Sequence, residues 1–215
     1  MIKLDILSDP ICPWCHIGKA HLFRALEKHP DHPFALEWHP FQLNPDMPRG
    51  GMDRRAYLEG KFGGKDGAVR AYAPVVEAAA DAGLSINFEG IAKTPNTLDA
   101  HRLIHWAGLE QRQTPVVQAL FEAYFEKGLD IGDIPTLIDL GVGCGLDRDM
   151  LTRLFASDAD TADIQARDAH ARDRGVSGVP TFVIDNQHVL RGAQPPHLWG
   201  QVIEEITAQL KARQA

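Results

Sequence analysis

The stretch that decides the fold is Asp9-Pro10-Ile11-Cys12-Pro13-Trp14-Cys15. The residues before it, from Ile2 to Leu7, alternate between apolar and polar side chains and predict a strand that ends near Asp9. After Cys12, apolar residues recur at helical spacing as far as His29, which predicts a helix. The two cysteines therefore stand where a strand turns into a helix, and this is the context that a redox CxxC motif needs.

The position of each cysteine on this helix suggests its role. At a helix N-terminus, free NH groups and the helix dipole favour a thiolate, so we expect Cys12 to be the exposed nucleophile. Cys15 lies one turn further in and is better shielded, so we expect it to resolve the mixed disulfide. Pro13 suits the first helical turn, and Trp14 either shields the sulfur or packs in the core.

Further strands are predicted on both sides of a long middle region. Residues 34–38 alternate as a second strand, and the first strand, helix and second strand form a unit with the length of a right-handed parallel crossover. Residues 181–184 and 188–190 predict two more strands joined by a turn at Asp185 and Asn186. A final amphipathic helix follows Pro195 and Pro196. The order is βαβ, a middle region, then ββα.

The middle region, residues 52–175, shows helical periodicity only. Its predicted helices begin near acidic, basic or hydroxyl residues, and glycines mark their ends: the starts are Asp53, Lys65, Thr94, Asp133, Asp147 and Asp158, and the ends are Gly83, Gly108, Gly128 and Gly175. We therefore expect residues 1–42 and 176–215 to form one discontinuous sheet-based domain, interrupted by an all-helical subdomain at 52–175.

The composition excludes several classes of protein. A chain of 215 residues with 44% hydrophobic and 24% charged residues can form a globular core. A formal charge of −7, from 22 basic and 29 acidic residues, argues against nucleic acid as a partner. No apolar run reaches about 18 residues and no secretory signal is evident, so we expect no membrane contact and a cytoplasmic location. Three cysteines need no disulfide framework in a reducing compartment.

The CxxC stretch and several others together resemble one known family. The matching stretches are residues 9–15, Gly178-Val179-Pro180-Thr181-Phe182, Asn96-Thr97, residues 100–104 and Gly192-Ala193-Gln194-Pro195. The chain is similar over nearly its whole length to the DsbA-like thioredoxin family, and most similar to its cytoplasmic FrnE-like branch. The resemblance implies an α/β thioredoxin-like fold with a large inserted helical subdomain. It also implies that the Val179–Pro180 bond is cis and faces the active-site sulfurs.

The resemblance implies thiol–disulfide exchange with protein or low-molecular-weight thiols and disulfides, without a metal or a resident cofactor. Cys12 and Cys15 are the implied catalytic residues, and Pro13, Trp14, Val179 and Pro180 the implied substrate-binding residues. His16, next to Cys15, is a possible electrostatic modulator of Cys12. The oligomeric state is left open.

The same residues allow other functions. The branch is also similar to 2-hydroxychromene-2-carboxylate isomerases and kappa-class glutathione transferases, in which a serine generally stands at the position of Cys12. Glutathione is thus a possible co-substrate, and a glutathione-dependent isomerase or transferase is the alternative enzyme. A non-enzymatic alternative is a redox-sensing, chaperone-like or peptide-binding module.

Metal and haem chemistry are minor alternatives. Residues 12–16 spell CxxCH, the haem attachment signature, and a zinc site could combine Cys12, Cys15 and Cys144 with a histidine. Cys144 is more simply a small, partly buried residue without a redox role. His101 and His105 share a helix face, but the glutamate of a metalloprotease motif is missing.

Overall fold

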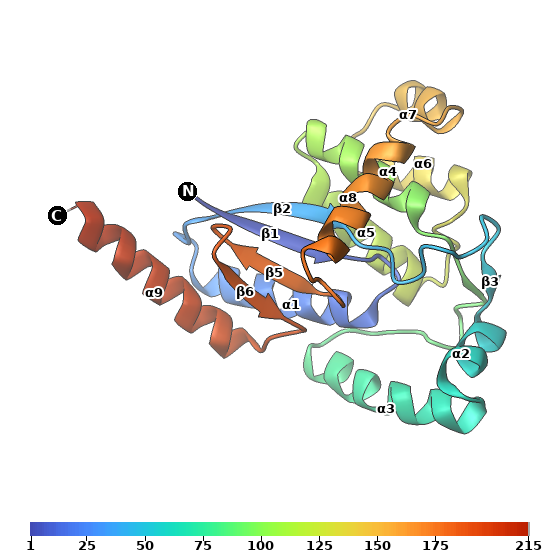
Figure 1. The fold of residues 1–215 in the computed structure, drawn as a ribbon, viewed down its shortest axis with the longest axis horizontal. Helices are drawn as coiled ribbons and strands as arrows, with labels where there is room; N and C mark the ends of the chain where they lie inside the picture. Colours follow the sequence, from blue (N-terminus) through green and yellow to red (C-terminus); the bar gives the residue numbers. More distant parts are fainter. Residues whose placement is uncertain (215) are drawn as a thin grey trace.

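The central sheet joins segments from the two ends of the chain. In the computed structural model, which describes residues 1–214, the strand order is β2-β1-β5-β6 (Figure 1). Strand β1 (Ile2–Ser8) pairs in parallel with β2 (Phe34–Pro40) and antiparallel with β5 (Thr181–Ile184). Strand β6 (His188–Arg191) completes a hairpin with β5. Asp185 and Asn186 both have positive φ in its turn, at 52° and 55°, as a tight hairpin of this twist requires.

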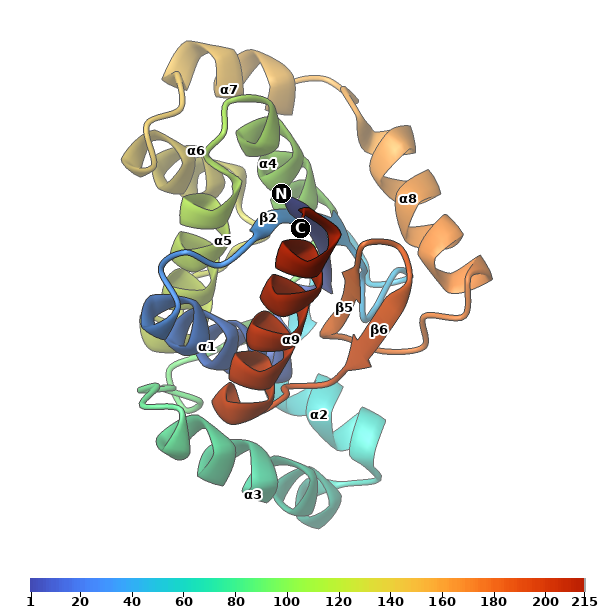
Figure 2. The ribbon, with the colours of Figure 1, turned by 90° about the vertical axis from the view of Figure 1, so that its left-hand side faces the viewer.

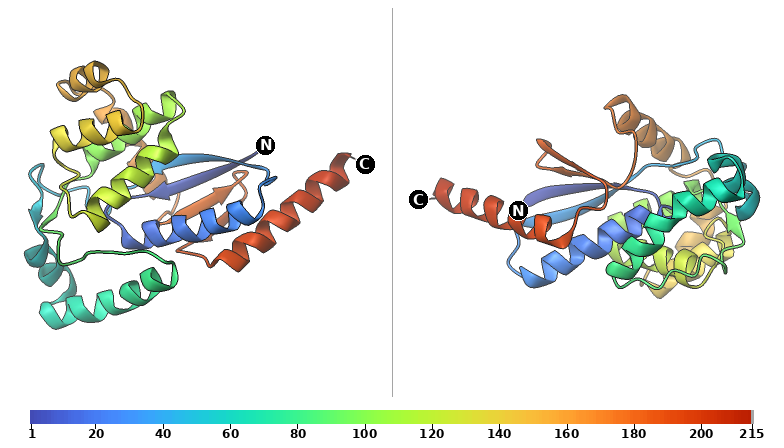
Figure 3. Two further views of the ribbon diagram at one scale, coloured as in Figure 1. Left: turned by 180° about the vertical axis from the view of Figure 1, so that it is seen from behind. Right: turned by 90° about the horizontal axis from the view of Figure 1, so that it is seen from below.

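Two helices cover one face of this sheet. Helix α1 (Pro13–Lys28) connects β1 to β2, and α9 (Pro196–Gln214) lies beside it (Figure 3). The aromatic rings of Phe182 on β5 and Trp199 on α9 meet edge to face with centroids 4.8 Å apart. Burying two aromatic side chains in this geometry fixes α9 against the sheet. The βαβ and ββα units predicted from the sequence are thus present, and the α/β thioredoxin-like fold with a helical insertion is confirmed.

The insertion contains most of the helices. They are α2 (Arg54–Phe62), α3 (Lys65–Asp81), α4 (Leu98–Leu109), α5 (Gln113–Phe121), a π-helical turn η1 (Glu122–Glu126), α6 (Ile134–Gly143), α7 (Arg148–Phe155) and α8 (Thr161–Asp173). The aspartates predicted to start α2, α6 and α7 are N-caps, because the carboxylates of Asp53, Asp133 and Asp147 each accept a backbone N–H of the first turn.

The prediction of an all-helical insertion was wrong in one place. Met52–Asp53 (β3) and Lys93–Thr94 (β4) form a two-stranded antiparallel sheet. Thr94 therefore belongs to a strand and does not cap a helix. Helix α4 begins four residues later, at Leu98, where the Asn96 side chain accepts the Leu98 N–H at 2.9 Å.

Two further helix boundaries differ from the prediction. Gly108 lies inside α4, and the chain turns only at Gln111, which has a φ of 58°. Helix α8 starts at Thr161 and not near Asp158, because Asp160 at its N-cap takes up a left-handed conformation. At the end of α4 a non-glycine residue, Gln111, thus adopts the positive φ that the sequence pattern assigns to glycine.

The sheet and the insertion share one hydrophobic core. Leu4 and Ile6 of β1 belong to the same buried cluster as Leu103 of α4 and Phe121 of α5. Each of the two predicted segments of the sheet domain, 1–42 and 176–215, contributes strands to the central sheet. Ala215, the last residue of the second segment, lies outside the described residues. Over residues 1–214, no helix combines the length and the hydropathy that crossing a membrane would require.

Candidate active site

The two cysteines occupy the first turn of α1, at the carboxyl end of β1. Cys12 is the N-cap residue and Pro13 the first helical residue, as predicted. The Cys12 N–H donates to the Asp9 carbonyl at 2.9 Å, and the Cys15 N–H donates to the Cys12 carbonyl at 3.0 Å. These bonds hold the strand-to-helix turn and place the two free thiols one helical turn apart.

The segment 178–180 lies across from the first cysteine. The thiol of Cys12 donates to the carbonyl oxygen of Val179 at 3.5 Å, and the Val179–Pro180 bond is cis, as the resemblance implied. Pro180 is buried against α1, since a Cβ added to Gly18 would lie 3.0 Å from the Pro180 Cγ. Glycine at position 18 thus allows the segment to approach the helix closely.

Both sulfurs are buried, which corrects the prediction that Cys12 is exposed. Cys12 is 3% exposed and Cys15 is 1% exposed. The reason is the insertion, because Tyr57 and Phe62 of α2 and Tyr72 of α3 form a wall over the first turn of α1. Burial raises the pKa of the Cys15 thiol well above its ordinary value, and the neighbouring Cys12 sulfur raises it further. Cys15 is therefore held as a neutral thiol at pH 7.

Access to Cys12 is through a cavity of about 270 Å³, which we call the Cys12 cavity. Pro13, Trp14 and Val179 line it, whereas Pro180 does not. Other lining side chains come from α2 and α3, including Arg54, Tyr57, Lys61 and Tyr72. This volume is just below the usual range of small-molecule sites, which is about 300–1,000 Å³.

Arg54 is the feature of this cavity that the sequence did not reveal. Its side chain is buried, with 5% of the residue exposed. The guanidinium donates to the hydroxyls of Tyr124 at 2.9 Å and Tyr72 at 3.2 Å, and it lies over both rings. Burial raises the pKa of Tyr124 to about 12 and also raises that of Tyr72, so both hydroxyls stay neutral. Within residues 1–214 no carboxylate pairs with this buried cation.

His16 is buried as well, and it differs from the electrostatic modulator that we expected. Its ring stacks on Phe121 and Phe125, with centroids 4.9 Å and 5.5 Å away, and is 1% exposed. Burial, together with the nearby Lys19 charge, lowers the pKa of His16 to about 4. His16 is therefore uncharged at pH 7, and any influence on Cys12 cannot come from an imidazolium charge.

Asp9, which the sequence placed only at the end of a strand, is a fully buried carboxyl beneath the CxxC turn. Its two oxygens accept the N–H of Leu43 at 2.6 Å and of Ile11 at 3.4 Å, so it ties the residue before Cys12 to the segment after β2. Burial raises the pKa of Asp9 to about 7, although these hydrogen bonds oppose the shift. The sequence feature that could have indicated this buried carboxyl is the position of an aspartate directly after a buried strand.

The remaining cysteine and histidines do not form a zinc site. Cys144 is a half-buried C-cap of α6, and burial raises its pKa. Among the described residues, the potential metal ligands that gather within reach of one ion are Asp5, Glu37 and His39, and no cysteine is among them. His101 is buried beside Asp9, with its Nε2 3.8 Å from the carboxylate, while His105 contacts Arg167. The alternative zinc site of Cys12, Cys15, Cys144 and a histidine is not among the ligand clusters of the described residues.

A mixed sheet, a CxxC pair at the N-terminus of the first helix and a cis-proline segment facing it define a thioredoxin-like protein with a redox dithiol. Comparison with known sequences narrows this class, because the profile of the DSBA-like thioredoxin domain matches residues 3–204. The chain belongs to this family of thiol–disulfide oxidoreductases.

Individual relatives agree with this assignment. The uncharacterized protein YwbO of Bacillus subtilis is 27% identical over 95% of the chain and 96% of its own length. The crystal structure of a probable DsbA oxidoreductase from Streptomyces coelicolor has a TM-score of 0.85 and 28% identity, covering 95% of this chain and 89% of that one. The cytosolic disulfide reductase DsbM of Pseudomonas aeruginosa, solved with GSH, shares the fold, with a TM-score of 0.66, 20% identity, and coverage of 97% and 99%.

Proposed function

We propose that the chain exchanges two electrons with its substrates through Cys12 and Cys15, and that Cys12 is the residue that attacks. The contrast between the two thiols carries the proposal. Cys12 lines the cavity, whereas Cys15 is buried, does not line it and has a raised pKa. The Cys12 sulfur can meet a substrate in the cavity, and Cys15 stays a thiol until a mixed disulfide forms.

The exchange balances without any additional group. The Cys12 thiolate attacks one sulfur of a substrate disulfide, forms a mixed disulfide and releases the other substrate sulfur as a thiolate. Cys15 then gives its proton to the released substrate thiolate and attacks the Cys12 sulfur, which forms the Cys12–Cys15 disulfide and releases the second substrate sulfur as a thiolate. The substrate gains two electrons and the protein loses them. The reverse sequence oxidises a dithiol.

The dimensions of the Cys12 cavity favour a small substrate or a short extended segment. Pro13, Trp14 and Val179 would contact it, and Pro180 would act by holding Val179 in place. Glutathione is the low-molecular-weight candidate, because Arg54 and Lys61 offer two cations to its carboxylates and a structural relative was solved with GSH. We further propose that the chain belongs with the FrnE-like oxidoreductases, which the cysteine at position 12 supports, and that it is located in the cytoplasm.

Turnover of insulin and of glutathione disulfide by single-cysteine variants tests the function. We expect Cys12→Ser to lose activity by at least 100-fold and Cys144→Ser to behave as the wild type, since Cys144 does not line the Cys12 cavity. Full activity of Cys12→Ser contradicts the proposal. Retention of peptides by the wild type without any turnover favours the redox-sensing binding module, and glutathione-dependent isomerisation without disulfide turnover favours the isomerase alternative.

A further inference from the structure

A second, larger hollow lies on the face of the sheet that α1 and α9 leave free. It has a volume of about 500 Å³, and its lining residues come mainly from β1, the β5–β6 hairpin and α8 with the loop after it. We call it the sheet-face hollow, and Figure 2 shows how these elements are arranged around the sheet. Lys3, Asp5 and Leu7 of β1 line it, whereas Leu4 and Ile6 point into the core, as strand alternation requires. It shares no lining residue with the Cys12 cavity, so it is a separate site.

Apolar side chains form the floor of this hollow. Leu7 of β1, Val176 of the loop after α8, Val183 of β5 and Val189 of β6 line it. Val189 is 51% exposed, so its apolar surface is open to a ligand. A volume of 500 Å³ with an apolar floor falls within the usual range of small-molecule sites.

The charge at the rim of the hollow is opposite in sign to the net charge of the protein. Four lining residues are lysine or arginine, namely Lys3, Arg167, Arg174 and Arg191, and the only acidic one is Asp5. The whole chain, in contrast, has a formal charge of −7. The Asp5 carboxylate is already engaged, by the Lys3 ammonium at 2.9 Å and by the His39 ring at 2.5 Å. The hollow is therefore a local site of positive potential.

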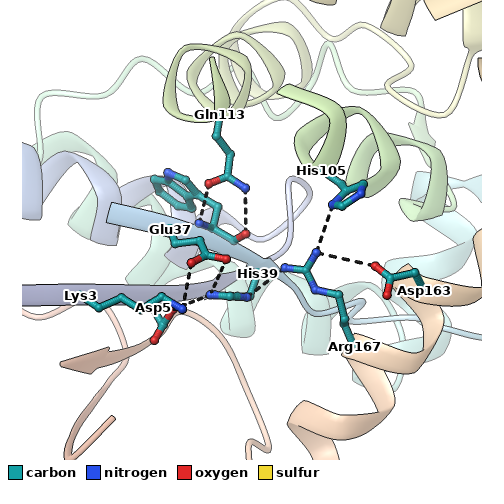
Figure 4. A network of polar contacts seen from close by, with 9 residues as sticks. Lys3, Asp5, Glu37, His39, His105, Gln113, Asp163 and Arg167 are labelled. Carbon is teal, nitrogen blue, oxygen red and sulfur yellow. Dashed lines mark hydrogen bonds and ion pairs between the residues drawn. The ribbon is translucent and has the colours of Figure 1, made fainter. Parts of the chain in front are cut away.

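The contacts of these cations show which charges remain available. Arg167 donates to the rings of His39 at 3.0 Å and His105 at 3.2 Å, and its nearest carboxylate, Asp163, is 3.9 Å away (Figure 4). Burial lowers the pKa of His39, so this partner is a neutral acceptor at pH 7. Arg174 and Arg191 are exposed and have no ion-pair partner among residues 1–214.

The cluster of Asp5, Glu37 and His39 does not offer a metal site beside the hollow. The Lys3 ammonium lies 2.9 Å from both Asp5 and Glu37, so a cation already stands between the two carboxylates (Figure 4). The ligand that suits this face is thus an anion.

We propose that the sheet-face hollow binds a small organic anion with an apolar body, such as an aliphatic or aromatic carboxylate. The apolar body would cover Leu7, Val183 and Val189, and removing this apolar surface from water would favour binding. The anionic group would lie at the rim between Arg174 and Arg191. Charge complementarity favours this occupant over a second copy of the same acidic chain.

Isothermal titration of the full chain with octanoate, and with octanol as its neutral counterpart, tests the proposal. We expect octanoate to bind at least tenfold more tightly than octanol, and the Arg174→Gln/Arg191→Gln double variant to lose that preference. Val189→Glu should weaken octanoate binding at least tenfold, while Val76→Glu on α3, an equally exposed valine that does not line the hollow, should leave it unchanged.

Three outcomes overturn the proposal. They are equal binding of octanoate and octanol, equal effects of Val189→Glu and Val76→Glu, and a dimer in light scattering that Val189→Glu dissociates. The last would show that this face binds a second copy. Disulfide turnover should be the same in all these variants, so a failure here leaves the function proposed for Cys12 and Cys15 intact.

Discussion

The sulfur of Cys12 and the carbonyl oxygen of Val179 lie 3.5 Å apart, although 167 residues separate them in the sequence. The contact depends on the pairing of β1 with β5, in which Leu7 is opposite Thr181. The candidate site therefore exists only when both ends of the chain are folded together.

The first prediction concerns this dependence. A fragment of residues 1–50 contains only β1 and β2 of the central sheet, too few strands for a stable core, so we expect it to remain unfolded. Circular dichroism during heating should show no cooperative transition, whereas the full chain should give one. A cooperative transition in the fragment would mean that residues 1–42 and 176–215 do not form one discontinuous domain.

The second prediction concerns the two cysteines. In Cys15→Ser the nucleophile remains but the resolving thiol is absent, so the reaction should stop at the mixed disulfide. We expect intact-mass measurements after incubation with glutathione disulfide to show at least tenfold more adduct on Cys15→Ser than on Cys12→Ser. The two variants have the same number of thiols, so each is the control for the other. Equal adduct on both would contradict the assigned roles.

The fold was predictable from the sequence because its signals are local. A strand that ends at Asp9 and a helix that begins with Cys12 and Pro13 follow from alternation, helical spacing and the place of proline in a first turn. The hairpin at Asp185 and Asn186 follows in the same way. The β3–β4 pair was missed because two-residue strands have no periodicity, and they form only through pairing between distant segments.

The surroundings of the site were not predictable, because they depend on tertiary packing. Cys12 is buried by side chains of α2 and α3, which lie about fifty residues away in the sequence. His16 is neutral because Phe121 and Phe125 enclose it, and nothing in the stretch around Cys15 indicates those partners. Arg54 follows the predicted helix start at Asp53, and nothing in the sequence distinguishes it from the neighbouring Arg55, which is exposed.

The third prediction concerns Arg54. Its buried charge has only neutral partners, so an anionic substrate should be attracted to the Cys12 cavity and a cationic one repelled. We expect Arg54→Gln to lower kcat/KM for glutathione disulfide about tenfold, or roughly 1.4 kcal/mol, and to leave that for cystamine unchanged or higher. Because no carboxylate loses a partner, the variant should still fold, which thermal unfolding checks.

Arg55→Gln is the matched control for this experiment. It removes the same charge from the neighbouring position, but Arg55 is exposed and does not line the Cys12 cavity. We expect it to change kcat/KM for neither substrate by more than about twofold, which is a difference of roughly 0.4 kcal/mol. Equal losses in Arg54→Gln and Arg55→Gln would assign the effect to the overall charge of the chain and not to the cavity.

The last prediction concerns the pH dependence of stability that His16 creates. Burial lowers its folded pKa from 6.5 to about 4, so between these values the unfolded chain binds a proton that the folded chain does not. The contribution to stability is complete above pH 6.5 and is lost as the pH falls toward 4, on the order of 3 kcal/mol.

Phenylalanine keeps the ring stacked on Phe121 and Phe125 and has no proton to bind. Both ring nitrogens of His16 are buried without a partner, so the replacement leaves no other group without its hydrogen bond. His101 and Asp9 titrate in the same range, but they are present in both proteins and cancel in the difference. The stability of His16→Phe relative to the wild type, measured by urea unfolding, should therefore increase from pH 7 to pH 4.5. A difference that stays constant over this range would show that His16 is not held neutral in the folded protein.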